Sequence, residues 1–251
     1  MRLHVHEWGE GQPVVCLHGV TGHGRRFERL AARWSGFRTI APDLRGHGQS
    51  GWDPPYDFAT HVGDLIETID GLGLERPDWV GHSWGGRLVL ELAAAHPDRV
   101  RRAVLLDPAI DLLPHVAEFM TEAEQAEPIF DSPSDYRERR SDAGTAPAEL
   151  VEADALMHCD VLPDGRLRRR THQPAVVSIY AELGTPGPPR PAAPTLLLYS
   201  PAYGMVRDEH VAAYDDVVTV PGMHMVMWEA FDETADAVEQ FLRSEDPRAE
   251  R

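Results

Sequence analysis

Residues 77–96 read PDWVGHSWGGRLVLELAAAH and place one serine, Ser83, among glycines between two apolar segments. The segment before Ser83 is short and apolar, which indicates a buried strand, and the segment after it has the length of a helix. Gly81, Ser83 and Gly85 form a G-x-S-x-G pattern in this strand–turn–helix context. A serine on so tight a turn needs small neighbours, and the following helix N-terminus favours negative charge developing on its hydroxyl oxygen. We therefore predict that Ser83 is a nucleophile rather than only an N-cap residue.

Short apolar runs alternate with helical patterns along much of the chain. We expect strands at 2–7, 13–18, 37–42, 78–82, 102–107, 195–200 and 217–220, and helices at 25–34, 58–72, 84–96, 207–214 and 229–243. Asp57 precedes the second of these helices as its expected N-cap. Apolar strands separated by helices predict an α/β fold, with a mostly parallel sheet covered by helices on both faces.

The alternation fails between residues 108 and 193. This stretch is helical, irregular and rich in proline and acidic residues, and it ends in the proline-rich run GTPGPPRPAAP at 184–194. We predict a core made of 1–110 and 191–251, interrupted by a helical cap at 111–190. The basic run RLRRR at 166–170 follows a DG pair, so we expect it to be a solvated face.

Composition excludes several classes of partner. The 251 residues carry 41 acidic and 24 basic side chains, a net charge of −17, which argues against binding nucleic acid or an anionic membrane. The chain has no apolar run long enough to span a membrane and no apolar signal-peptide segment at its start, so we expect a cytoplasmic protein. Its two cysteines give no disulfide framework, and the two histidines of HVH at 4–6 are too few ligands for a metal site.

A serine nucleophile needs two backbone N–H donors for the oxyanion that forms on attack. The residue after Ser83 is Trp84, whose amide is the first expected donor. The run CLHGVTG at 16–22 ends a neighbouring strand and places the Val20 amide as the second.

Five segments together resemble the α/β-hydrolases of the compact, cap-bearing kind. They are LHG at 17–19, APDLRGHGQS at 41–50, GHSWGG at 81–86, HPDRVRRAVLLDPA at 96–109 and VPGMHMVMWEAFDE at 220–233. They occur in family order and span nearly the whole chain except the insertion. The resemblance implies an eight-stranded sheet with a helical cap inserted after the sixth strand.

The family order of catalytic residues, serine then acid then histidine, implies that His224 is the general base. The acid departs from the usual pattern, because PAYG at 201–204 holds no carboxylate and Tyr203 stands at the usual position. Asp107 ends the strand RAVLLD, where some relatives, including certain lactone hydrolases and haloalkane dehalogenases, place their acid. We predict Asp107 as the triad acid, with Asp208 as the alternative.

The resemblance implies a serine hydrolase that cleaves an ester or lactone bond of a small, largely apolar molecule through an acyl-enzyme, with no metal or organic cofactor. A C–C bond hydrolase, a non-hydrolytic lyase or cyclase, and a ligand-binding protein with a vestigial triad stay open as alternatives. We expect an apolar pocket formed by cap side chains: Phe119, Met120, Phe130, Tyr136, Met157, His158 and Tyr180.

Overall fold

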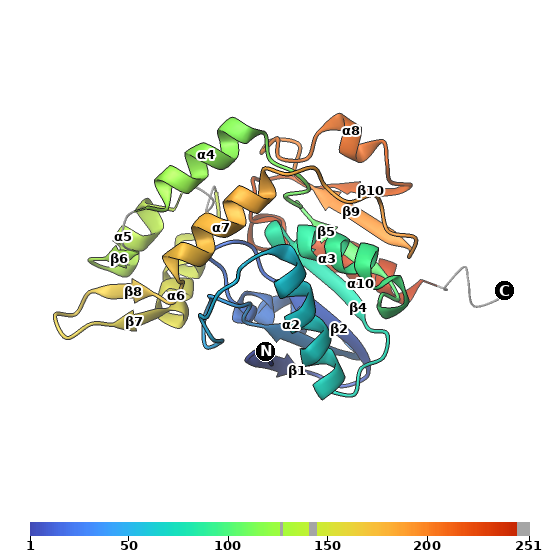
Figure 1. Ribbon diagram of the computed structural model, residues 1–251, viewed down its shortest axis with the longest axis horizontal. Coiled ribbons are helices and arrows are strands. Elements are labelled where there is room, and N and C mark those ends of the chain that lie inside the picture. Colours follow the sequence, from blue (N-terminus) through green and yellow to red (C-terminus); the bar gives the residue numbers. More distant parts are fainter. Residues whose placement is uncertain (126–127, 141–144, 245–251) are drawn as a thin grey trace.

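The computed structural model describes residues 1–125, 128–140 and 145–244. Its core is a seven-stranded sheet in the order β1-β3-β2-β4-β5-β9-β10, in which only β1 runs antiparallel to its neighbour (Figure 1). The strands are β1 (Val5–Trp8), β2 (Gln12–Leu17), β3 (Phe37–Pro42), β4 (Asp78–His82), β5 (Ala103–Leu106), β9 (Thr195–Tyr199) and β10 (Asp216–Thr219). The expected mostly parallel α/β sheet is confirmed.

The expected count of eight strands is wrong by one. The N-terminal segment forms only β1 and β2, joined by three residues. Gly9 and Gly11 in that connection have φ of 70° and 114°, which closes a tight turn and leaves no residues for a third strand. The cap therefore follows the fifth strand along the chain rather than the sixth.

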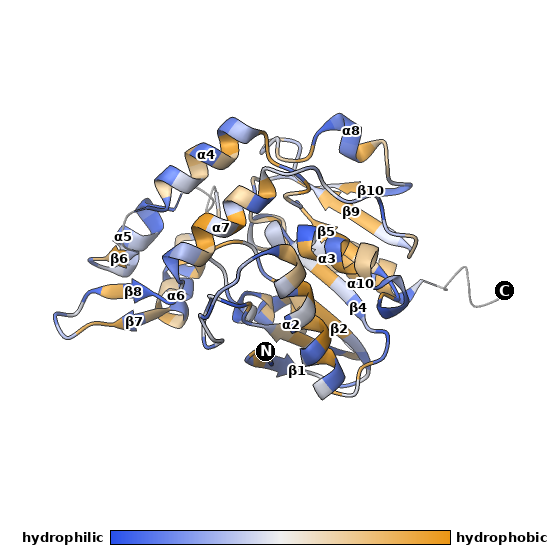
Figure 2. Cartoon of the chain, in the orientation of Figure 1, coloured by the Kyte–Doolittle hydropathy of each residue, from blue (hydrophilic) through white to orange (hydrophobic). Residues whose placement is uncertain are grey.

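Helices cover both faces of the sheet because each central strand is apolar on both sides. Along β2, Val14 and Cys16 face one apolar cluster, and Val15 and Leu17 face the other. One face packs against α2 (Phe58–Gly71) and α3 (Trp84–Ala95), and the opposite face against α1 (Glu28–Arg33) and α10 (Phe231–Arg243). Figure 2 shows the apolar residues concentrated in the central strands. Asp57 is the N-cap of α2, since its side chain accepts a hydrogen bond from the Thr60 amide at 2.7 Å.

The described part of the insertion after β5 contains four helices and, unexpectedly, three short strands. The helices are α4 (Pro114–Ala123), α5 (Pro133–Glu138), α6 (Ala148–His158) and α7 (Gln173–Leu183). The strands β6 (Ile129–Phe130), β7 (Cys159–Val161) and β8 (Leu167–Arg169) form a separate antiparallel sheet in the order β6-β8-β7. The β7–β8 connection is closed by a 2.8 Å hydrogen bond from the Leu162 amide to the Arg166 carbonyl. None of these strands joins the central sheet.

Two short helices, α8 (Asp208–Val211) and α9 (Val226–Glu229), follow β9 and β10. Within the described ranges, no helix combines the length and the apolar character needed to cross a membrane.

Candidate active site

Ser83 stands on the turn between β4 and α3 in a strained backbone conformation. Its φ of 55° and ψ of −120° lie in a region that side-chain-bearing residues rarely adopt. The flanking glycines permit the turn, because a Cβ on Gly81 would stand 2.3 Å from the Gly85 carbonyl oxygen. A Cβ on Gly85 would stand 2.2 Å from the Leu17 carbonyl oxygen. The glycines of the G-x-S-x-G pattern are therefore a steric requirement of the turn that holds Ser83 at the N-terminus of α3.

His224 and Asp107 lie close together although 117 residues separate them in the chain. Asp107 follows β5 and is fully buried, and His224 follows β10. Nδ1 of His224 is 2.6 Å from Oδ2 of Asp107, and Oδ1 of Asp107 accepts a hydrogen bond from the Ser200 amide at 3.1 Å. A carboxylate that accepts from Nδ1 fixes the imidazole tautomer in which Nε2 can take a proton.

Two further groups hold the His224 segment. The ring of Tyr203 stacks on the imidazole with the centroids 4.6 Å apart, and Nε2 of His82 donates a 2.9 Å hydrogen bond to the His224 carbonyl. Tyr203, at the usual chain position of the acid, thus covers the face of the imidazole, whereas Asp107 contacts its Nδ1 edge. The alternative acid, Asp208, is exposed at the start of α8, and among the described residues the carboxylate that hydrogen-bonds to His224 is that of Asp107.

The loop after β2 passes directly beside Ser83. A Cβ on Gly19 would lie 3.0 Å from the Ser83 Cβ, and the Gly22 amide donates to the Gly19 carbonyl at 3.0 Å to close the loop. This loop carries Val20, whose side chain lines the same cavity as Ser83. Trp84 begins α3, where the first amides of a helix have no intrahelical acceptor. This placement is compatible with the predicted use of the Val20 and Trp84 amides as oxyanion donors.

His18 holds this loop through hydrogen bonds. Its Nε2 accepts a 3.0 Å hydrogen bond from the Leu44 amide, so Nδ1 carries the proton and donates to the Gly19 carbonyl at 2.8 Å. Burial holds the pKa of His18 well below its ordinary value, which keeps the ring neutral. His18 therefore has a structural role in holding the loop.

A cavity between the core and the cap is lined by both Ser83 and His224. Three of the cap residues predicted to line it do so: Met120, Phe130 and Tyr180. Five residues that were not predicted add further apolar surface: Ala109, Leu112, Val116, Leu183 and Met205. The expected apolar character therefore holds for much of the wall.

Four cap residues predicted to line the cavity lie elsewhere: Phe119, Tyr136, Met157 and His158. Phe119 is on the outer face of α4 and is 66% exposed. Tyr136 is buried and donates a hydrogen bond to Asp154, whereas Met157 lines a separate surface hollow. The His158 ring is stacked on the ring of His23 with the centroids 4.5 Å apart. These expectations are wrong because residue type alone does not show which face of a cap helix turns toward the core.

Charged side chains, which were not predicted, also line the cavity. They are Glu124, Arg139, Arg140 and Arg169. The run at 166–170 is solvated at Arg166 and Arg168, but Leu167 and Arg169 are buried. The expectation of a wholly solvated face is therefore wrong, because the two-residue period of β8 turns alternate side chains inward. That alternation was the signal in the sequence that could have identified Arg169.

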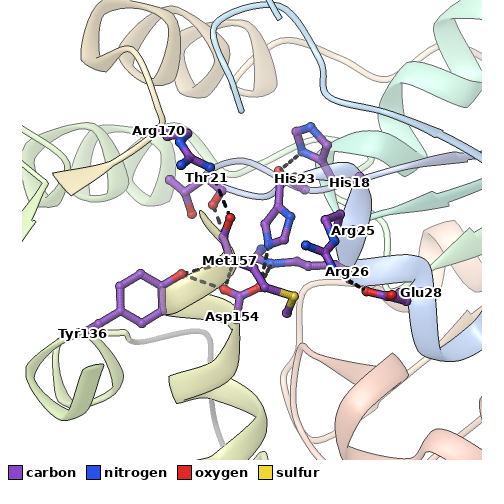
Figure 3. A network of polar contacts seen from close by, with 12 residues as sticks. His18, Thr21, His23, Arg25, Arg26, Glu28, Tyr136, Asp154, Met157 and Arg170 are labelled. Carbon is purple, nitrogen blue, oxygen red and sulfur yellow. Dashed lines mark hydrogen bonds and ion pairs between the residues drawn. The ribbon is translucent and has the colours of Figure 1, made fainter. Parts of the chain in front are cut away.

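A buried polar network joins the insertion to the core (Figure 3). Asp154 of α6 accepts hydrogen bonds from His23 Nε2 at 2.8 Å, from Arg26 at 2.9 Å and from the Tyr136 hydroxyl at 2.7 Å. Burial alone would raise the pKa of the Asp154 carboxyl, but the guanidinium of Arg26 and its hydrogen bonds hold that pKa well below its usual range. Arg26 Nη2 also lies 3.4 Å from the Thr21 carbonyl oxygen, so the network connects the cap with the loop beside Ser83.

One group of metal-ligating side chains lies close together among the described residues: His4, His6 and Asp43, with ligand atoms within 4.8 Å of one another. Asp43 Oδ1 already accepts from the Gly24 amide at 2.8 Å and is 3.2 Å from His6 Nε2. None of the three lines the cavity of Ser83 and His224.

Comparison with known proteins identifies the family. The family model described as alpha/beta hydrolase fold matches residues 12–180. The chain belongs to the α/β-hydrolase family. The chain is 37% identical over 222 residues to lipase LipV of Mycobacterium tuberculosis. This match covers 85% of this chain and 84% of that protein.

Solved structures give the same fold. E-2-(acetamidomethylene)succinate hydrolase is similar with a TM-score of 0.83 at 26% identity, covering 96% of this chain and 95% of that one. An esterase from Exiguobacterium antarcticum is similar with a TM-score of 0.77 at 19% identity, covering 96% of each chain, which shows a shared fold. Together, the family model and the relatives make this α/β-hydrolase chain a hydrolase.

Proposed function

We propose that this α/β-hydrolase is a serine esterase or lactonase that acts on a small molecule, apolar along much of its length, through an acyl-enzyme. The observation that carries the proposal is the 2.6 Å hydrogen bond between His224 Nδ1 and Asp107 Oδ2 at a cavity that Ser83 also lines. The names of LipV and of the structurally similar esterase support ester cleavage as the reaction.

In the proposed reaction, Ser83 Oγ attacks the carbonyl carbon of the substrate while His224 Nε2 takes the serine proton. The carbonyl oxygen becomes an oxyanion and accepts hydrogen bonds from the Val20 and Trp84 amides. Asp107 holds the imidazole and stabilises its protonated form. When the carbonyl re-forms, the bond to the leaving oxygen breaks, and His224 gives its proton to that oxygen.

The acyl-enzyme is then hydrolysed by the same groups. His224 takes a proton from water as the water oxygen attacks the acyl carbon, and it returns the proton to Ser83 Oγ as the acid leaves. A lactone follows the same steps, except that the released hydroxyl stays attached to the acyl chain. No step requires a group beyond the residues of this chain and water.

Hydrolysis of 4-nitrophenyl acetate tests the proposal. We expect a rapid burst of nitrophenol equal to the enzyme concentration, followed by steady turnover, because acylation by this activated ester should be faster than hydrolysis of the acyl-enzyme. Ser83→Ala should remove the burst and the turnover. Ser35→Ala, a change at an exposed serine outside the cavity, is the matched control and should leave both unchanged. Turnover that persists in Ser83→Ala would overturn the proposal.

A further inference from the structure

Arg169 combines burial with an unused hydrogen-bond donor. Its side chain is 8% exposed. Nε donates to the Thr171 hydroxyl at 2.9 Å, and Nη2 donates to the carboxylate of Glu124. Among the residues that the structure describes, none accepts a hydrogen bond from Nη1 of Arg169, and this nitrogen is not sealed within the packed interior. The side chain lines the cavity that contains Ser83 and His224.

A structural ion pair alone does not account for this arrangement. Burying a guanidinium is costly unless its donors find acceptors, so proteins rarely leave one of its nitrogens unused away from bulk water. Because the side chain of Arg169 lines the cavity, a group bound there could accept a hydrogen bond from Nη1. Arg169, Ser83 and His224 therefore face one shared cavity.

The wall around Arg169 favours an anion. Arg139 and Arg140 line the same cavity, and Glu124 is the one carboxylate among its described lining residues. Asp135 and Asp154 pair with the two neighbouring arginines from outside the cavity wall. The net charge of −17 on the whole chain opposes this only weakly, since surface charges are screened over roughly 8 Å at physiological ionic strength.

We propose that Arg169 binds a carboxylate of the substrate, so that the preferred esters are half-esters of dicarboxylic acids or lactones that carry a carboxylate. This inference rests on the proposed function and adds the substrate class to it. A planar carboxylate suits the guanidinium edge, and the charge-assisted hydrogen bond from Nη1 would restore the missing partner. The apolar side chains of the cavity would contact the chain between the carboxylate and the ester.

Two 4-nitrophenyl esters of similar length test the assignment: the half-ester of adipic acid and the neutral heptanoate. We expect the enzyme to hydrolyse the adipate half-ester with the higher kcat/KM. Arg169→Met should lower the ratio of kcat/KM, adipate over heptanoate, by roughly ten- to hundred-fold, as for loss of a charge-assisted hydrogen bond. Arg168→Met, which removes the exposed neighbouring arginine on the same strand, is the matched control and should leave the ratio unchanged.

A second variant, Glu124→Gln, should change the ratio of kcat/KM in the opposite direction. Its result does not depend on whether Arg169→Met folds. Glu124→Gln removes the carboxylate that competes for Arg169, so the ratio should rise several-fold. A wild-type preference for heptanoate, or a lower ratio in Glu124→Gln, would overturn the carboxylate assignment while the esterase proposal stands. If neither ester is hydrolysed and no burst occurs with 4-nitrophenyl acetate, the proposed function and the carboxylate assignment fail together.

Discussion

The ring of Tyr203 lies almost parallel to the imidazole of His224, with the centroids 4.6 Å apart and the planes at 17°. A second contact comes from Asp107, whose carboxylate Oδ2 is 2.6 Å from Nδ1 of the imidazole. The imidazole is thus held by a ring across its face and by a carboxylate at its edge. Asp107 follows β5, whereas Tyr203 lies in the segment after β9, so two separate parts of the sheet edge supply the two contacts.

The stacking predicts that the ring of Tyr203, rather than its hydroxyl, affects kcat. Tyr203→Ala removes the contact with the imidazole face, and an aromatic pair is worth about 0.5–1.5 kcal/mol, so kcat should fall roughly three- to ten-fold. Tyr203→Phe keeps the ring and should retain most of the wild-type kcat. Steady-state kinetics on 4-nitrophenyl acetate compare the two variants, and equal losses in both would show that the hydroxyl, rather than the stacking, matters.

The geometry predicts a large effect of Asp107 on rate. Asp107→Asn keeps the size of the side chain but removes the carboxylate charge, and kcat should fall by roughly 10³–10⁴ while KM changes little. Asp208→Asn is the matched control at the exposed start of α8 and should stay near the wild-type rate. A crippled Asp208→Asn enzyme together with a mild Asp107→Asn effect would contradict the assignment of the acid.

The turn glycines predict a stability difference between two Gly→Ala changes. Gly85→Ala would place a Cβ 2.2 Å from the Leu17 carbonyl oxygen, a backbone atom, and should lower the free energy of unfolding by about 1–3 kcal/mol or more. Gly63→Ala is the control on the exposed face of α2, where a Cβ meets nothing within 4 Å, and it should stabilise the helix by up to about 1 kcal/mol. Urea unfolding measures both, and a harmless Gly85→Ala would argue against the close packing of the turn.

Buried neutral histidines predict that stability falls in mild acid. Burial lowers the pKa of His47 from 6.5 to about 3 and the pKa of His61 from 6.5 to about 4. Below pH 6.5 the unfolded chain binds protons that the folded chain resists, so the contribution of each histidine is present above that pH and is lost as pH falls toward its folded pKa. Between pH 6.5 and its folded pKa, each histidine should lower the free energy of unfolding by about 1.4 kcal/mol per pH unit. Urea unfolding at pH 7 and pH 5 checks the trend, and equal or greater stability at pH 5 would contradict it.

Most of the core could be predicted from the sequence because its signals are local. The ranges expected for β3 and β4 match the structure, and Asp57 caps α2 as its position indicated. The excess strand in the expected count came from family resemblance rather than from a local pattern. The two glycines between β1 and β2 were the local evidence for a simple turn.

The cap was harder to predict because its structure depends on contacts distant in sequence. The strand β8 pairs with β6, nearly forty residues earlier in the chain, as well as with the nearby β7, and the side chain of Arg169 lines the cavity in this assembled sheet. Likewise, Tyr136 and Asp154 become buried together through partners in the core, such as Arg26. Side-chain type indicated an apolar pocket, but only the packing of the cap helices decides which side chains form it.

The most direct test of the account is the site of covalent labelling by a fluorophosphonate, which reacts with an activated serine. Intact-protein mass spectrometry should show one phosphonyl group per chain, and peptide mapping should place it on Ser83. Asp107→Asn should label far more slowly, and Ser83→Ala should not label. A label on another residue, or an unlabelled wild-type chain that still hydrolyses 4-nitrophenyl acetate, would contradict the claim that Ser83 is the nucleophile.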